Sequence, residues 1–138
     1  MSTSTLAERA RQEVVELHDF FVAWMRGETP AGDFSRAEAS ISRHFRMSSP
    51  DGKIEESAAV LAWIKGAQGS RPSPFTIAVL DHRTIWAGED AALLEYTEQQ
   101  YRDGRTTRRR STALFVANPA APCGVEWHHL QETWMEAG

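Results

Sequence analysis

Two glutamates, Glu95 and Glu132, are the side chains best placed to do chemistry, because both fall on strand positions that we expect to face an apolar pocket. A carboxylate inside an apolar pocket loses its water, which raises its pKa, and a second carboxylate nearby raises it further. A carboxyl group adjusted in this way can act as a general base near neutral pH. The alternative is a structural ion pair with Arg109 or Arg110, and the sequence leaves both interpretations open.

The adjacent histidines His128 and His129 are the next candidates. Side chains of neighbouring strand residues point to opposite faces, so only one of the two can point into a pocket, and they cannot bind one metal ion together. A lone strand histidine is also commonly a hydrogen-bonded packing residue. The sequence has no zinc-site spacing, no glycine-rich phosphate loop and no nucleophile elbow. We therefore expect neither a metal nor a cofactor.

Cys123 is the single cysteine, so the chain can form no intrachain disulfide. An activated thiol needs a base or a cation beside it. None lies near Cys123 in the sequence, which favours an incidental loop cysteine.

A helical first half must help to position these groups. Thr5 and Glu8 form a capping box before a helix whose apolar residues recur every three or four positions, and Gly27 is a natural end for that helix. Shorter elements should follow: a helix from residue 33 or 35 to about 42, a strand at 44–48, a turn at 49–52 and a helix at about 55–67.

The second half is rich in strands. Asp103-Gly104 is typical of a hairpin turn. Long strands are expected at 75–86, 91–102, 106–117 and 125–135.

Helices followed by long strands joined by short turns predict an α+β fold with a mostly antiparallel sheet. Such a sheet curls, so the first helix can close its concave side. The strands are apolar on both faces, as the adjacent Leu93 and Leu94 indicate. An exposed apolar face marks an interface, so we expect a homodimer through the outer sheet face. A length of 138 residues is typical of a single domain, here residues 1–138.

The charge pattern excludes some partners. A net charge of −4 argues against nucleic-acid binding, which needs a positive surface. The one basic run, Arg105 with residues 108–110, is interpreted as a solvated strand face or a small anion patch. No apolar run has the length of a membrane span, and residues 1–5 lack the features of a signal peptide. We therefore expect a cytoplasmic protein that binds neither nucleic acid nor membranes.

Several segments carry a resemblance to a known superfamily: the first helix with Trp24, and residues 49–52, 92–98, 110–115 and 127–133. Together with the order of the elements, they resemble the nuclear transport factor 2-like superfamily, in particular its SnoaL-like members and the association domain of calcium/calmodulin-dependent protein kinases. The resemblance covers nearly the whole chain. It implies a cystatin-like cone, with N-terminal helices packed on a strongly curved sheet, and usually a homodimer. Members include isomerases, cyclases, dehydratases and modules without catalysis, so the fold leaves the function open.

The resemblance also implies which residues line the cone. The kinase association domain points three strand arginines inward, and they align with Glu95, Ala113 and Glu132 of this sequence. Strand alternation extends this assignment along each strand, provided that the 103–104 hairpin carries one extra residue. The predicted ligand pocket consists of Phe21, Trp24, Leu93, Glu95, Thr97, Arg109, Ser111, His128, Leu130, Glu132 and Trp134.

Two functions are consistent with this pocket. The first is a small-molecule-binding protein of the SnoaL-like group, with an apolar ligand and no cofactor, acting as a homodimer. The alternative is a cofactor-free isomerase, cyclase or dehydratase that acts on a hydrophobic carbonyl compound, with Glu95 or Glu132 as the base and His128 as its partner. The catalytic Asp and Tyr of the steroid isomerases find no counterpart in this sequence. A pure oligomerisation module is a third possibility.

Overall fold

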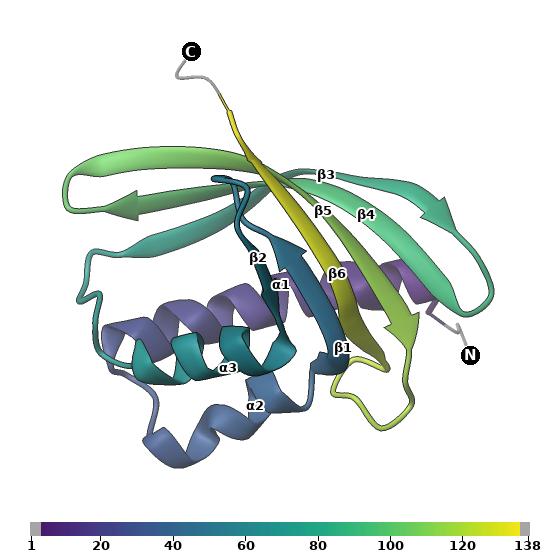
Figure 1. Cartoon of the computed structure of the whole chain (residues 1–138), viewed down its shortest axis with the longest axis horizontal. Helices are drawn as coiled ribbons and strands as arrows, with labels where there is room; N and C mark the ends of the chain where they lie inside the picture. The colour runs from purple at the N-terminus through teal and green to yellow at the C-terminus, as the bar shows by residue number, and fades with distance from the viewer. Residues whose placement is uncertain (1–3, 136–138) are drawn as a thin grey trace.

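The computed structural model describes residues 4–135 as helices packed on one face of a curved sheet (Figure 1). The helices are α1 (Leu6–Arg26), the 3-10 turn η1 (Ala31–Phe34), α2 (Ser35–Glu38) and α3 (Ser57–Gly66). The strands are β1 (Ile41–Ser48), β2 (Ile54–Glu56), β3 (Thr76–Ala87), β4 (Ala91–Arg102), β5 (Arg105–Ala117) and β6 (Val125–Trp134). The predicted α+β class is confirmed.

The described strands form one mixed sheet in the order β2-β1-β6-β5-β4-β3. All neighbours are antiparallel except β1 and β6, which run parallel. Within residues 4–135, no helix combines the length and the apolar character that a membrane span needs.

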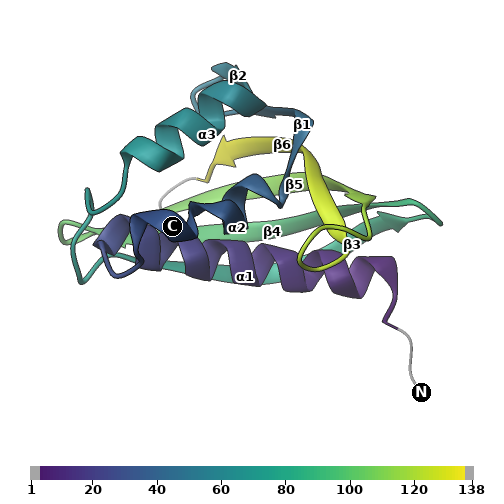
Figure 2. The same ribbon diagram turned by 90° about the horizontal axis from the view of Figure 1, so that it is seen from below.

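Helix α1 begins and ends where the sequence predicts. The Thr5 hydroxyl accepts from the Glu8 N–H at 3.1 Å, and the Glu8 carboxylate accepts from the Thr5 N–H at 3.2 Å, which completes the capping box. Gly27 ends the helix with φ 79°, a left-handed conformation that glycine adopts without a side-chain penalty. The helix lies across the concave side of the sheet (Figure 2), so its apolar face forms much of the core.

The short elements differ from the prediction. Residues 54–56 form β2 on the edge of the sheet, so helix α3 begins at Ser57 instead of 55. The second helix ends at Glu38, because β1 already begins at Ile41. Ile41 lies opposite Trp127 of β6, a contact between distant segments that local sequence patterns do not contain.

The β4–β5 hairpin determines which residues of the two strands share a face. Arg102 pairs with Arg105 across a two-residue turn, in which Asp103 and Gly104 have φ of 53° and 76°. Two positive φ values are typical of a type I′ turn, which contains no extra residue. Glu98 therefore lies opposite Arg109, and directly opposed residues share one face of the sheet.

A β-bulge interrupts β6. Phe115 of β5 pairs with Trp127, whereas Leu114 pairs with His129, so His128 is the extra residue. The bulge changes the alternation of side chains, with the result that Trp127 and Leu130 both face the concave side.

The convex face of the sheet carries an apolar row. Trp86, Leu93 and Leu114 are paired across β3, β4 and β5. The Trp86 side chain is 56% exposed, which is high for a residue of this size. This row lies on the face opposite the helices.

Candidate functional site

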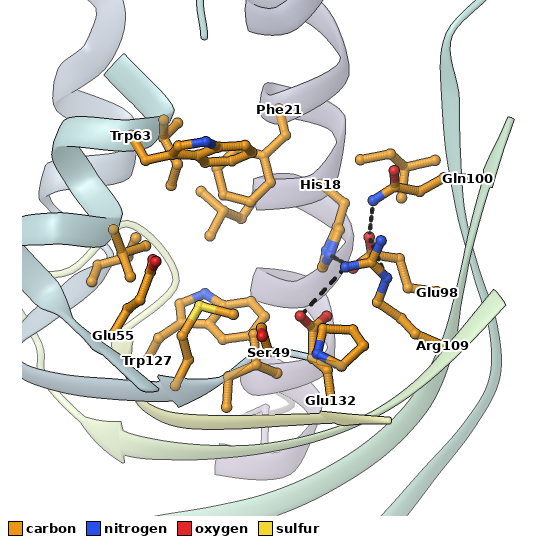
Figure 3. Close-up of a pocket in the computed structure, with 18 of the residues that line it drawn as sticks. His18, Phe21, Ser49, Glu55, Trp63, Glu98, Gln100, Arg109, Trp127 and Glu132 are labelled. Atoms are coloured by element: carbon orange, nitrogen blue, oxygen red, sulfur yellow. Dashed lines mark hydrogen bonds and ion pairs between the residues drawn. The ribbon is translucent and has the colours of Figure 1, made fainter. Parts of the chain in front are cut away.

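A cavity of about 450 Å³ lies between α1, α3 and the concave face of the sheet. Its walls are mostly apolar, because α1 contributes Phe21, α3 contributes Trp63, and β6 contributes Trp127 and Leu130. Figure 3 shows Trp63 and Trp127 on opposite sides of the space. Another side holds His18, Glu98, Gln100, Arg109 and Glu132 close together.

Four charged or titratable side chains form the polar side of the cavity: His18, Glu98, Arg109 and Glu132. His18 Nε2 lies 2.9 Å from Glu98 Oε1, and Arg109 Nη1 lies 3.5 Å from Glu132 Oε1. Arg109 Nε is 3.9 Å from Glu98 Oε2. The arginine therefore lies between the two carboxylates and links them.

The His18–Glu98 pair is buried and charged. Burial alone would lower the pKa of His18, but the charge and hydrogen bond of Glu98 outweigh it and raise that pKa. Burial likewise opposes the Glu98 carboxylate, yet His18 and then Arg109 hold the pKa of Glu98 at about 2. The Val14 carbonyl lies 2.6 Å from His18 Nδ1 and orients the ring. The pair therefore stays ionised on the polar side of the cavity.

Glu132 has the opposite character. Burial and the negative charge of Glu98 raise the pKa of Glu132 to about 7, although Arg109 opposes them. The Ser111 hydroxyl donates to Glu132 Oε2 at 3.4 Å. A carboxyl group that faces a cavity with this pKa can accept or release a proton near neutral pH.

Arg109 retains hydrogen-bonding capacity. Its contacts with both carboxylates are longer than the 2.7–2.9 Å or so of a good charge-assisted hydrogen bond. Among the described residues, buried Arg109 Nε has no hydrogen-bond partner. A ligand oxygen could therefore accept from this guanidinium.

The structure brings part of the predicted pocket together. Phe21, Arg109, Leu130, Glu132 and Trp134 line the cavity. Ser111 is buried on the same face and reaches Glu132, although it does not line the cavity.

Trp24 lies in the core instead of the cavity wall. Its side chain is buried, its indole N–H donates to the Ile64 carbonyl at 2.8 Å, and its ring stacks on Phe20. The helical periodicity placed it correctly on the apolar face, but α3 covers that part of the face.

The remaining predicted residues are displaced by an error in strand alternation. Leu93, Glu95 and Thr97 lie on the convex face, because the 103–104 turn lacks the extra residue that the prediction required. His128 is the bulge residue of β6 and does not line the cavity; its ring is 6.3 Å from that of His44. Of the three catalytic candidates, only Glu132 faces the cavity.

Sequence reasoning missed His18 and Glu98. His18 falls on the apolar face of α1, between Leu17 and Phe21 in the chain, and a titratable residue on a buried stripe was the available signal. Glu98 points to the opposite face of β4 from Glu95, so the same error in strand alternation assigned it to the convex face.

A third buried carboxylate lies behind Trp127. Glu13 is fully buried, and its oxygens accept from Arg36 at 2.9 Å and from the Trp127 indole N–H at 3.1 Å. This contact fixes the ring that forms one wall of the cavity. Across residues 4–135, no group of three or more His, Cys, Asp or Glu side chains is arranged to hold a metal ion.

Comparisons with solved structures identify the fold. An NTF2-like protein of unknown function from Pseudomonas aeruginosa has 25% identity and a TM-score of 0.85 over 93% of this chain and 99% of its own. A CaMKII hub from S. rosetta has 16% identity and a TM-score of 0.76 over 97% of this chain and 100% of its own. A ketosteroid isomerase-like protein from Shewanella frigidimarina has 15% identity and a TM-score of 0.66 over 91% of this chain and 94% of its own.

No protein-family model and no curated protein matches the sequence. The fold and the solved structures carry the assignment: helices on one face of a curved mixed sheet, matched along nearly the full length of both chains. The chain therefore has the nuclear transport factor 2-like fold.

Proposed function

We propose that this chain is one domain that binds a small, mostly apolar ligand in the cavity between α1, α3 and the sheet. The observation that carries the proposal is the cavity itself, whose volume of about 450 Å³ falls within the range of small-molecule sites. Apolar walls and a few polar groups along one side are the composition expected of such a site.

The test is thermal stabilisation by a panel of small aromatic and alicyclic compounds. A ligand at a hundred times its Kd should stabilise the fold by about 2.7 kcal/mol, which raises the Tm by several degrees. Leu130→Trp should fill part of the cavity and remove the effect. Leu80→Trp adds the same ring at an exposed position of β3 and should keep it. Equal shifts in both variants would place binding elsewhere.

A second candidate is proton transfer on a carbonyl compound, and the observation that favours it is Glu132. The carboxylate would remove a proton next to the carbonyl group, and the negative charge would develop on the carbonyl oxygen, where Arg109 could donate. The proton held on Glu132 would then return to carbon. The Shewanella frigidimarina protein of the same fold is ketosteroid isomerase-like, which is consistent with this chemistry.

Deuterium exchange tests this candidate. 2-Tetralone in heavy water should exchange its acidic C–H protons faster with the protein than with buffer, and Glu132→Gln should abolish the difference. Glu95→Gln is the matched control, because Glu95 lies on the convex face. A wild-type rate equal to that of buffer, across a panel of cyclic ketones, would exclude the enzyme.

We also propose a homodimer through the convex face. The exposed Trp86 and its paired neighbours Leu93 and Leu114 support this interface, because an apolar row of this kind favours a partner. Leu114→Arg should give monomers of 15.5 kDa by light scattering, whereas Val15→Arg on the exposed side of α1 should not. A wild-type mass near 15.5 kDa at micromolar concentration would contradict the dimer.

A further inference from the structure

Arg71 is a cation of the cavity wall that the site described above does not use. It lies between α3 and β3 and lines the cavity. Its guanidinium carbon is 5.7 Å from the centre of the Trp63 ring and 5.3 Å from that of Phe75. Its backbone N–H donates to the Met25 carbonyl at 2.8 Å. Aromatic contacts of this kind hold the plane of an arginine and leave its N–H edge open to an acceptor.

The other charged side chains of the cavity wall already have partners. His18 pairs with Glu98, Arg109 with Glu98 and Glu132, and Lys53 with Glu55, while Asp51 accepts from the indole N–H of Trp134. Among residues 4–135, Arg71 takes part in no ion pair and in no side-chain hydrogen bond.

The surroundings of Arg71 also favour an anion. Burial and the positive charges of Arg102 and Arg109 lower the pKa of Arg71, because the cation is partly desolvated and near like charges. With Glu132 ionised, two cations (His18 and Arg109) balance two carboxylates (Glu98 and Glu132) on the polar side of the cavity. Among the described charged side chains of the cavity wall, Arg71 is then the cation without an ion-pair partner, and Asp51, which accepts from the neutral Trp134 indole, is the carboxylate without one.

We infer that the ligand of this cavity carries one carboxylate group that pairs with Arg71, while its apolar body lies against the aromatic walls. A single negative charge matches the single unpaired cation, and the planar carboxylate matches the guanidinium fork. A phosphate dianion would bring a second negative charge close to Glu98 and Glu132. This inference rests on the proposed ligand-binding function and specifies the class of ligand.

The experiment uses matched probes by calorimetric titration of the full chain. Benzoate, 2-naphthoate and 9-anthracenecarboxylate are compared with their neutral amides, and 2-naphthyl phosphate is included as a dianion. We expect at least one carboxylate to bind about tenfold or more tightly than its amide, the size of one charge-assisted hydrogen bond. The naphthyl phosphate should bind more weakly than 2-naphthoate.

The variants assign the preference to a residue. Arg71→Met keeps the apolar stem and should make each acid and its amide bind equally, whereas Arg71→Lys should keep part of the preference. Arg102→Met removes a nearby exposed charge that does not line the cavity, and it should keep all of the preference. Thermal melts verify that each variant is folded.

The outcomes separate the inference from the proposed function. Equal binding of acids and amides by the wild type would overturn the carboxylate inference and leave the ligand cavity in place. A preference that survives Arg71→Met but is lost in Arg109→Lys would overturn the assignment to Arg71. If no member of any pair binds, the proposed function and the inference both fail.

Discussion

Replacing Glu132 by glutamine should reduce the pH dependence of the protein's stability between about pH 5 and pH 8. The folded protein holds the Glu132 proton more tightly than the unfolded chain does, because burial and Glu98 raise the folded-state pKa to about 7 from an ordinary 4.5. For an acid whose pKa is raised on folding, stability is highest below pH 4.5 and decreases as the pH rises towards 7.

The size of the effect follows from the shift. One pKa unit corresponds to about 1.4 kcal/mol. Because of Glu132 alone, the free energy of unfolding should therefore decrease by about 3 kcal/mol as the pH rises from below 4.5 to above 7. Glutamine keeps the shape but does not titrate. At pH 8 the Glu132→Gln variant should therefore be up to about 3 kcal/mol more stable than the wild type, because the net pKa shift already includes the attraction to Arg109.

Urea denaturation at pH 5, 6, 7 and 8 measures this difference. The variant should show the shallower dependence, although not a flat one, because the raised pKa of His18 also makes stability decrease as the pH rises through its folded value. Glu95→Gln on the convex face is the matched control and should follow the wild type. Equal slopes for wild type and Glu132→Gln, or a wild type that becomes more stable with pH, would refute the reasoning.

Three further substitutions test the buried contacts. His18→Leu should destabilise the fold by about 3 kcal/mol or more, because it leaves the Glu98 carboxylate buried without its nearest cation. Arg36→Met should have an effect of similar size through Glu13, and it should also change the fluorescence of the tryptophan that Glu13 holds. Gly27→Ala should cost about 1–2 kcal/mol, because φ is 79° and an added Cβ would lie 3.3 Å from the Cα of Gly69. Urea denaturation near pH 6 measures all three.

Each of these substitutions has a control of the same chemistry at an open position. His44→Leu, Arg43→Met and Gly32→Ala should change stability by no more than about 0.5 kcal/mol. A control that destabilises as much as its partner would show that the loss of the residue type, and not of the buried contact, is responsible.

Local patterns were sufficient to predict most of the fold. The Thr5–Glu8 capping box, the Gly27 end of α1 and the 103–104 turn all depend on residues close together in the chain, and all are confirmed. Long apolar runs bounded by turn residues predicted β4 with the bounds that the structure has, 91–102.

The candidate site was harder to predict, because it depends on which face of the sheet each strand residue points to and on contacts between residues far apart in the chain. The prediction assumed one extra residue in the β4–β5 turn, and this assumption reversed the two faces of β4. Glu95 was therefore predicted to face the cavity, although it lies on the convex face, and Glu98 was not recognised as a cavity residue. The pairing of His18 with Glu98 joins residues 80 positions apart, and neither neighbourhood contains a signal for the other. Glu132 lines the cavity on β6 beyond the bulge, on the face that the pocket prediction assigned to it, and its role in binding or catalysis stays a prediction.

The bulge at His128 has a consequence for how the cavity wall can change by insertion and deletion. If β6 kept all its residues but ran as a regular strand without a bulge, with Trp127 facing inward, Gln131 and Thr133 would point inward and Glu132 would point outward. Removing His128 itself would join Trp127 directly to His129 and restore regular pairing with β5, with the same side chains facing the cavity. One added or lost residue elsewhere in β6 would instead exchange the carboxyl group of the cavity for a neutral side chain.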